Sequence, residues 1–372
     1  VDFGFHIPMS IGNRVWRDNG AAAGHLNNGI MDADESFIPN VRVELYRDNG
    51  NGTFGAEDGA AIRFDDTDAG GYYLFDNLPA GNYFVHIPAA EFQSGGDLFG
   101  FNNSTPDGAE NVQVPGNELV HTPITDSDDN GVYNTRPDTN GITSGLITLA
   151  LATEPPGETD LSGQADPTAP ANAANNPTGW DGPNSRGRFG EADNNSNLTV
   201  DFGFLPVYSL GNRVWLDDGA GGGTPADGLI NGGEAGIGGV TVNLYRDSNN
   251  DGTPDGARIA FDTTDANGYY RFDNLIADHY IVEVVTPAGL GSTTDANQDP
   301  DDDVDNDDNG VIILPTVVRS HPITLGGAVP EPTADTDAAP NPNLADGEAP
   351  NNQSNRTVDF GFIQAVAIGN VI

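Results

Sequence analysis

The feature that most constrains this 372-residue chain is a long internal repeat. The pentapeptide Val-Asp-Phe-Gly-Phe begins at positions 1, 200 and 358, so its copies are spaced by 199 and then 158 residues. Shortly after each copy comes a second shared segment, which reads Ile11-Gly-Asn-Arg-Val-Trp16, Leu210-Gly-Asn-Arg-Val-Trp215 and Ile368-Gly-Asn370. Motifs that recur in a fixed order are typical of tandem domains, and they predict two complete units of related fold.

The repeats are out of register with the ends of the sequence. We expect residues 1–5 to form the last strand of a preceding repeat, or a donor strand shared with a neighbouring subunit. Residues 6–205 then form the first repeat, 206–363 the second, and 364–372 the first strand of a following repeat. A window from a longer tandem array is the simplest interpretation. The alternative is a subunit whose terminal strands pair with its neighbours, and the missing Arg and Trp of the last copy mildly favour it.

Short β-rich segments separated by turn residues indicate the fold class. Segments such as 241–245 and 280–285 are rich in the β-branched and aromatic residues that favour strands. Asp265-Ala-Asn-Gly-Tyr269, between two such segments, is typical of a hairpin, and we find no convincing helical period. About seven short strands per unit predict an all-β chain of tandem immunoglobulin-like β-sandwich domains with long acidic loops. We expect Trp16 and Trp215 to lie in the two cores.

The charge of the chain excludes several functions. Fifty-six acidic residues against 14 basic ones give a formal net charge of −42, and the sequence contains neither Cys nor Lys. A field this negative repels nucleic acid and anionic membranes, and it attracts cations. The absence of Cys excludes disulfides and thiolate metal sites. No apolar run approaches the ~18 residues of a membrane span, so we expect no membrane insertion in this window.

The first candidate metal site is a loop that occurs in both repeats. Calcium needs hard oxygen ligands, and calcium loops commonly place Gly at position 6 and a bidentate Glu at position 12. Gly29 and Gly228 fit position 6, while positions 1 and 3 lack ligands, so upstream Asp residues would have to loop back. The candidate ligands are Asp18, Asn28, Asp32 and Glu35 in the first repeat and Asp217, Asp218, Asp227, Asn231 and Glu234 in the second.

A second candidate loop covers residues 247–255, with Gly252 at position 6. Position 12 is Arg258, so the last carboxylate would have to come from elsewhere, such as Asp262 or Asp265. The first repeat matches this loop more weakly. The candidate ligands here are Asp247, Asn249, Asp251, Asp255 and Asp265, with Asp48 in the first repeat.

A third candidate is the stretch 295–309, which holds eight Asp residues. Carboxylates this close repel one another strongly unless cations intervene. We take Asp301, Asp303 and Asp305 as its candidate ligands. For all three sites the alternative interpretation is that acidic loops only solvate the surface.

Five segments of the chain resemble the SdrD B-like repeats of bacterial surface proteins, which are related to Cna-B modules. They read LGNRVWLDDG, VTVNLYRD, TTDANGYYRFDNL, DDDVDNDDNG and TVDFGF. The resemblance implies an extracellular, calcium-stabilised stalk of immunoglobulin-like domains. It also implies Ca²⁺ ligation by Asp217, Asp227, Asn231, Glu234, Asp247, Asn249 and Asp251 and their first-repeat counterparts. The isopeptide crosslink of the wider family cannot form here, because it requires Lys.

Two functions follow as hypotheses, and neither is enzymatic, since no hydrolase, zinc-protease or dinucleotide-binding signature is present. The first is a structural region of an extracellular bacterial fibre, filament or stalk, in which several Ca²⁺ ions stiffen each repeat and the partners are neighbouring repeats or copies of the chain. The second is an adhesin that binds a host protein or glycan. The loop around Trp180 has no counterpart in the second repeat, and it is the best candidate for such a surface.

Overall fold

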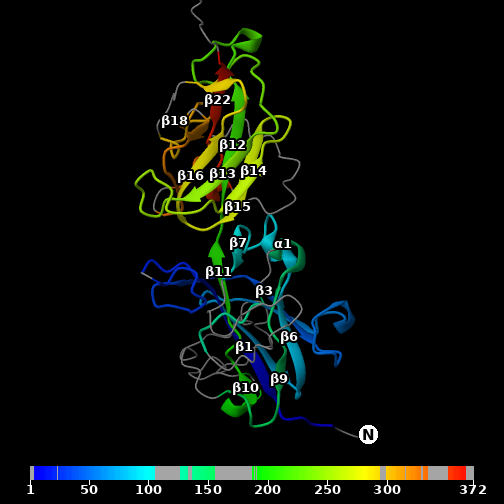
Figure 1. Ribbon diagram of the computed structural model, residues 1–372. Coiled ribbons are helices and arrows are strands. Elements are labelled where there is room, and N and C mark those ends of the chain that lie inside the picture. The colour runs from blue at the N-terminus through cyan, green and yellow to red at the C-terminus, as the bar shows by residue number, and fades with distance from the viewer. Residues whose placement is uncertain are drawn as a thin grey trace, which may run out of the picture. The chain divides into compact units, whose positions relative to one another are not determined.

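The computed structural model describes residues 4–22, 24–104, 126–132, 136–155, 187, 189, 191–293, 299–314, 316–327, 330–333 and 351–365 (Figure 1). The chain divides into two compact units, Val1–Pro206 and Val207–Ile372. No described helix is long and apolar enough to cross a membrane.

The first unit is built from two β-sheets. In the first sheet β1 is the central strand, and the order is β10-β1-β11-β7, with β2 and β5 also paired to β1. The second sheet has the order β4-β3-β6-β8, with β9 also paired to β6. The strands are β1 (Met9–Arg17), β2 (Ser36–Phe37), β3 (Arg42–Arg47), β4 (Arg63–Asp66), β5 (Tyr72–Leu78), β6 (Gly81–Ile87), β7 (Phe101–Asn103), β8 (Ile142–Thr143), β9 (Ile147–Leu149), β10 (Ser196–Asn197) and β11 (Phe202–Pro206).

The second unit repeats this plan. Its first sheet has the order β15-β12-β22-β17, with β21 also paired to β12. Its second sheet has the order β14-β13-β16-β19-β18, with β20 also paired to β16. The strands are β12 (Tyr208–Leu216), β13 (Thr241–Arg246), β14 (Ala260–Thr263), β15 (Tyr269–Leu275), β16 (Asp278–Val285), β17 (Leu290–Ser292), β18 (Val311–Leu314), β19 (Val317–Arg319), β20 (Ile323–Leu325), β21 (Ser354–Asn355) and β22 (Phe360–Gln364).

Helical structure in the described residues is confined to single turns. The only α-helix among them is α1 (Pro137–Asn140). The 3₁₀ turns are Ala56–Asp58, Ala89–Phe92, Asp193–Asn195, Ala220–Gly222 and Asn351–Gln353. The predicted all-β class of tandem β-sandwiches is therefore confirmed.

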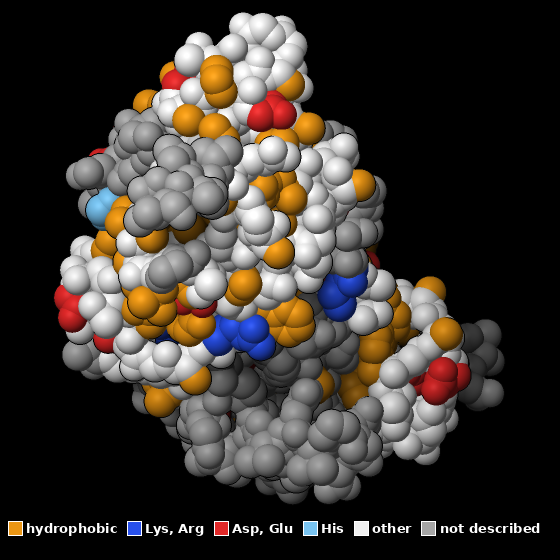
Figure 2. All heavy atoms as spheres, turned by 45° about the horizontal axis from the view of Figure 1, so that its top comes forward, with side chains coloured by type: hydrophobic (Ala, Val, Ile, Leu, Met, Phe, Trp, Pro, Cys, Tyr) orange, Lys and Arg blue, Asp and Glu red, His pale blue; other side chains and the backbone are white. Residues whose placement is uncertain are grey.

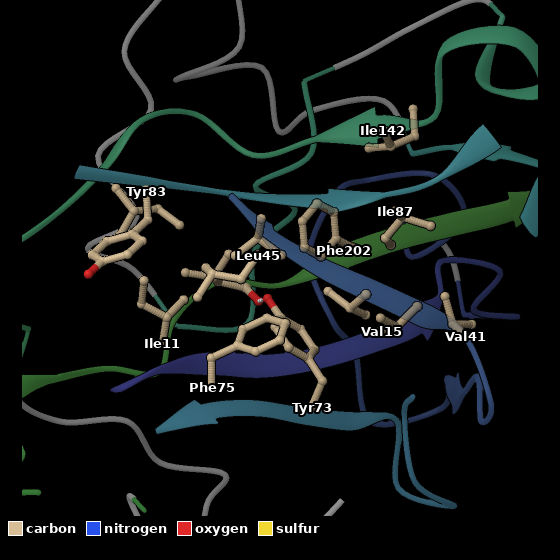
Figure 3. Close-up of a cluster of buried hydrophobic side chains, with 14 of the residues drawn as sticks. Ile11, Val15, Val41, Leu45, Tyr73, Phe75, Tyr83, Ile87, Ile142 and Phe202 are labelled. Atoms are coloured by element: carbon tan, nitrogen blue, oxygen red, sulfur yellow. Dashed lines mark hydrogen bonds between the residues drawn. The ribbon is translucent and has the colours of Figure 1, made fainter. Parts of the chain in front are cut away.

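The core of each unit lies between its two sheets. Figure 3 shows this for the first unit, where Ile11 and Val15 from β1 lie among Leu45 from β3 and Ile87 from β6. Strands place alternate side chains on one face, so the β-branched and aromatic residues of both sheets meet in one apolar layer. Trp16 and Trp215 are completely buried, but neither belongs to the two clusters of apolar side chains between the sheets, in which we expected them. Their rings lie against Gly203 and Gly361 of the closing strands.

The first and last strands of each unit lie side by side and run in the same direction. In the second unit Val214 pairs with Phe360, and in the first unit Val15 pairs with Phe202. The Val-Asp-Phe-Gly-Phe segment thus closes the unit that the Gly-Asn-Arg-Val-Trp segment opens. The Gly-Asn-Arg-Val-Trp segment of the second unit has to begin with Gly, because a Cβ atom on Gly211 would collide with the carbonyl oxygen of Tyr270.

The hairpin predicted around Asp265-Ala-Asn-Gly-Tyr269 is a tight turn, but it does not join two paired strands. The backbone N–H of Gly268 donates to Asp265 O (3.1 Å), as a turn requires. However, β14 before the turn pairs with β13 in the second sheet, and β15 after it pairs with β12 in the first. The chain therefore crosses from the second sheet to the first at this turn.

Candidate metal centre

The first acidic loop covers residues 18–35 and its counterpart 217–234. Asp18 directly follows β1 and is completely buried. Its carboxylate accepts hydrogen bonds from the backbone N–H groups of Asn28 (3.1 Å) and Gly29 (2.7 Å). Gly29 has a φ angle of +72°, a left-handed conformation that glycine adopts without strain. The loop therefore folds back onto the carboxylate at its own start.

The second repeat builds the same loop around Asp217, which is also completely buried. The backbone N–H groups of Ala226 (2.7 Å) and Gly228 (2.9 Å) donate to its two oxygens. Gly228 matches Gly29 with a φ angle of +75°. Asp217, one of the upstream Asp residues, thus lies against the loop that follows it. Asp218 instead accepts from the backbone of Ala220 (3.0 Å), two residues along the chain.

A Glu closes the loop in each repeat. The carboxylate of Glu35 accepts from the N–H groups of Gly20 (3.0 Å) and Asp32 (2.9 Å). Glu234 makes the equivalent bonds to Gly219 (2.8 Å) and Asn231 (2.9 Å). Both Glu side chains therefore point back towards the residues that follow β1 and β12.

An Asn–Asp pair bridges the two sides of each loop, with the residues exchanged between repeats. In the first, the Asn28 amide donates to Asp32 Oδ2 (2.9 Å). In the second, the Asn231 amide donates to Asp227 (3.0 Å to Oδ2). Asn28 corresponds in position to Asp227, and Asp32 to Asn231. The exchange preserves one carboxylate and one amide at this place, so the loop keeps its charge as well as its shape.

The carboxyl groups of the first loop lie close enough to perturb one another. Burial raises the pKa of Asp18 above its ordinary value. Burial also raises the pKa of Glu35 to about 7, and the negative charges of Asp18 and Asp32 add to the rise. Desolvated carboxyl groups that repel one another are the setting in which a cation stabilises the ionised forms.

The second acidic loop, residues 247–255, winds around one buried carboxylate. Asp247 follows β13 and accepts from the backbone N–H groups of Asp251 (3.1 Å) and Gly252 (2.9 Å). Asn249 also accepts from Asp251 N–H (3.2 Å). In the first repeat Asp48 accepts from Gly52 N–H in the same way (3.0 Å). The backbone therefore turns around one carboxylate at this place in both repeats.

One carboxylate predicted for this loop, that of Asp265, lies elsewhere. Asp265 follows the end of β14, and that end pairs with the start of β13. Asp247 follows the opposite end of β13. At ~3.3 Å per residue the length of β13 separates these positions by roughly 16 Å. The carboxylate of Asp265 caps its own turn by accepting from Asn267 and Tyr269. Asp255 lies within the loop, and its backbone N–H donates to Arg246 O (2.9 Å).

The third acidic stretch does not converge on one point. The carboxylate of Asp301 accepts from the backbone N–H of Thr324 in β20 (2.9 Å). That of Asp303 accepts from the backbone N–H of Thr333 (2.7 Å). Asp305 accepts instead from the Asn212 amide in β12 (2.9 Å). The structure therefore does not bring together Asp301, Asp303 and Asp305 as one ligand set. Asp295 lies outside the described residues.

A buried polar network that the sequence prediction missed joins the acidic stretch to the last strand. Asp308 Oδ1 accepts from the N–H groups of Gly310 (3.0 Å) and Gly361 (3.2 Å), while Asp359 N–H donates to Asn309 Oδ1 (2.8 Å). The sequence did contain a signal for this network, because the two segments that form it, Asp-Asp-Asn-Gly and Val-Asp-Phe-Gly-Phe, occur in both repeats. The same bonds in the first unit involve Asp129, Gly131, Gly203, Asp201 and Asn130.

In Figure 2 the red side chains on the visible face occupy several separate places. Within the described ranges, no group of three or more His, Cys, Asp or Glu side chains is placed to hold a metal ion. Calcium can also take backbone carbonyls, Asn side chains and water as ligands. The oxygen-only donor set of the first loop suits Ca²⁺ on these terms.

Trp180, at the centre of the adhesin hypothesis, lies outside the described residues. That hypothesis stays a prediction.

Comparison with known proteins places these loops in a family context. The family described as "SdrD B-like domain" matches residues 9–112 and 208–321, which is more than half of the chain. The two matched segments cover the acidic loops at residues 18–35 and 217–234 and also those that follow β3 and β13.

Two curated relatives align with most of the chain. Serine-aspartate repeat-containing protein F of Staphylococcus epidermidis (strain ATCC 12228 / FDA PCI 1200) is 29% identical over 369 residues, covering 85% of this chain and 20% of the relative. Serine-aspartate repeat-containing protein D of Staphylococcus aureus (strain Newman) is 29% identical over 374 residues, covering 87% of this chain and 25% of the relative. The chain thus spans about a fifth to a quarter of the length of these relatives.

Two of the solved structures with low similarity to this chain are pilins. The minor pilin GBS52 of Streptococcus agalactiae aligns over 98% of this chain and 99% of its own, with 11% identity and a TM-score of 0.24. The shaft pilin SpaA of Lactobacillus rhamnosus GG aligns over 98% and 100%, with 8% identity and a TM-score of 0.23.

Proposed function

Because the chain belongs to the SdrD B-like domain family, we propose that it is a calcium-stabilised structural repeat region of an extracellular bacterial surface fibre or stalk. Its two units are non-enzymatic repeat domains whose role is to span distance. Neighbouring repeats, or further copies of the chain, are its partners in such a fibre. A location outside the cell agrees with the similarity of the chain to serine-aspartate repeat-containing proteins of staphylococci.

The observation that carries the calcium part of the proposal is the duplicated first loop. Both copies contain a buried Asp after a core strand, a left-handed Gly, an Asn–Asp pair and a closing Glu. The Asn and Asp of that pair have changed places while the charge and the hydrogen bond are kept. A loop that only solvated the surface would have no need to bury an Asp in both repeats.

Calcium would be held in each loop by the buried Asp, the Asn–Asp pair and the closing Glu, together with backbone carbonyls. The ion supplies positive charge that offsets the repulsion between these carboxylates. The residues themselves fix the loop, because the carboxylates already accept N–H bonds from both of its sides. Binding to the folded state alone then stabilises the unit. For a dissociation constant of ~10⁻⁴–10⁻³ M, 10 mM Ca²⁺ contributes about 1–3 kcal/mol per site.

Thermal unfolding of the whole chain tests the proposal. We expect the melting temperature to rise in millimolar Ca²⁺ relative to EDTA, and to rise much less in Mg²⁺. Replacement of both closing residues, Glu35→Gln and Glu234→Gln, should reduce the Ca²⁺-dependent rise. Glu44→Gln serves as the matched control, because Glu44 lies on β3 and outside all three acidic loops. A melting temperature that is the same in Ca²⁺ and EDTA would contradict the proposal.

A further inference from the structure

One edge strand of the second unit is apolar and exposed. β18 lies at the end of its sheet, and among the described strands it pairs with β19 alone. Its residues Ile312, Ile313 and Leu314 are 59%, 47% and 57% exposed. The register shifts between Ile312 and Leu314, so Ile313 has no directly opposite residue in β19. Proteins usually protect such edges, because the free backbone groups and apolar side chains can pair with another strand.

The strands at the other ends of the two second sheets are protected. β14, at the opposite edge of the same sheet, exposes Phe261, but the guanidinium of Arg258 lies over its ring (4.7 Å to the centroid). In the first unit β4 exposes Phe64, and Arg42 covers that ring in the same way (4.1 Å). β8 has only two residues. Charged side chains and short strands both block edge pairing, and β18 has no charged residue.

The charge of the chain limits which partner can reach this edge. Residues 309–330 contain no Asp or Glu, although 56 of the 372 residues of the chain are acidic. The one Arg of this stretch, Arg319, forms an ion pair with Glu283 (2.7 Å). Most surfaces of a second copy would bring negative charge to a chain that is already strongly negative, and they would be repelled. The β18 edge of a second copy brings none, so it matches this edge in both charge and apolar character.

The segment Val311–Leu314 is self-complementary when two copies run antiparallel. A two-fold axis between Ile312 and Ile313 sets Ile312 of each copy opposite Ile313 of the other, and Val311 opposite Leu314. Apolar and β-branched residues that lie directly opposite each other are favourable cross-strand pairs. The same arrangement gives the free backbone groups of both edges a hydrogen-bonding strand.

We propose that two copies of the chain associate laterally through β18, edge to edge and antiparallel, so that their second sheets join into one. This inference deepens the proposed function and rests on it, because it names the contact between copies in a surface fibre. A contact of four residues a side is smaller than the ~800 Å² per partner of a typical stable complex, so a single pair is weak. Many copies held side by side on one surface multiply such a contact.

Sedimentation equilibrium of the whole chain at micromolar to near-millimolar concentration tests the proposal. We expect a monomer–dimer equilibrium that tightens with added NaCl, since salt screens the repulsion between two acidic copies. Ile312→Lys places a charge in the contact twice per dimer and should weaken dimerisation roughly tenfold or more. Phe261→Lys is the matched control, because it adds the same charge at an equally exposed residue of the opposite edge, and it should dimerise as the wild type does.

Chemical crosslinking covers the case in which Ile312→Lys alters folding. The chain contains no Cys, so Ile313→Cys supplies a single thiol. A short bis-maleimide should link two copies of this variant much faster than two copies of Phe261→Cys.

Three results would overturn the inference: a wild type that stays monomeric at every concentration and salt, an Ile312→Lys variant that dimerises as the wild type does, or equal crosslinking of the two Cys variants. Each of them leaves the Ca²⁺-dependent melting, and with it the proposed function, unaffected.

Discussion

Metal-free protein should lose stability as the pH rises from 5 to 8, and Glu331 should account for a measurable part of the loss. Glu331 is buried and accepts a hydrogen bond from the Gly326 N–H (2.7 Å). Burial raises its pKa from 4.5 to about 7, and the charge of Asp301 adds to the rise. A carboxyl whose pKa is raised by folding favours the folded state when protonated. That contribution is complete below pH 4.5 and is lost as the pH passes 7.

The magnitude follows from the size of the shift. About 2.5 pKa units correspond to about 3 kcal/mol at a pH well above 7, as an upper value. Glu331→Gln keeps an oxygen that can accept from Gly326 and removes the charge. We therefore expect the variant to be more stable than the wild type by up to about 3 kcal/mol at pH 8, and by no more than about 1 kcal/mol at pH 5.

Urea unfolding of the whole chain in EDTA at pH 5 and pH 8 measures this difference. Other buried carboxyl groups, such as Asp129, also titrate, so the comparison of interest is between variant and wild type at each pH. Glu57→Gln, at an exposed residue, is the control for removing one negative charge from a chain of net charge −42. If Glu331→Gln and Glu57→Gln change the free energy of unfolding equally at pH 8, the reasoning from burial is refuted.

Three further predictions concern the core and the charge. Tyr270→Phe removes a buried hydroxyl that donates to Val358 O (2.7 Å) and should cost about 1–3 kcal/mol, measured by urea unfolding. Gly211→Ala should destabilise the chain by more than about 3 kcal/mol, because the new methyl group would collide with the carbonyl oxygen of Tyr270. Gly291→Ala is the control, since no atom lies within 4 Å of its new methyl group, and it should unfold almost as the wild type does. In EDTA, added NaCl should raise the melting temperature, since it screens the repulsion of a chain this acidic; a fall would contradict this.

The repeat made the architecture predictable. Because the two segments ending in Trp16 and Trp215 recur with the same neighbours, their burial and the existence of two related units followed from the sequence. The hairpin at Asp265 did not, since its turn residues specify a tight reversal but not which strand each arm pairs with. Sheet membership is decided by long-range packing of apolar faces, and local turn chemistry carries no information about it.

The candidate site was predictable in part for the same reason. The spacing around Gly29 and Gly228 indicated a folded-back loop, and the structure forms that loop in both units. The role of Asp359 was missed because its neighbours in the sequence are core aromatics, which suggested a purely apolar strand. Its partners, Asn212 and Asn309, come from segments that only the tertiary fold brings next to β22.

The parallel pairing of first and last strands has a mechanical consequence. Val214 to Leu216 pair with Phe360 to Phe362, and both strands run in the same direction. The chain therefore enters the second unit at one end of this pair and leaves it at the other. Tension along the chain pulls the two strands past each other, so it loads their hydrogen bonds together in shear. Such a joint resists force until several bonds break at once, whereas a hairpin pulled from its open end would come apart one bond at a time.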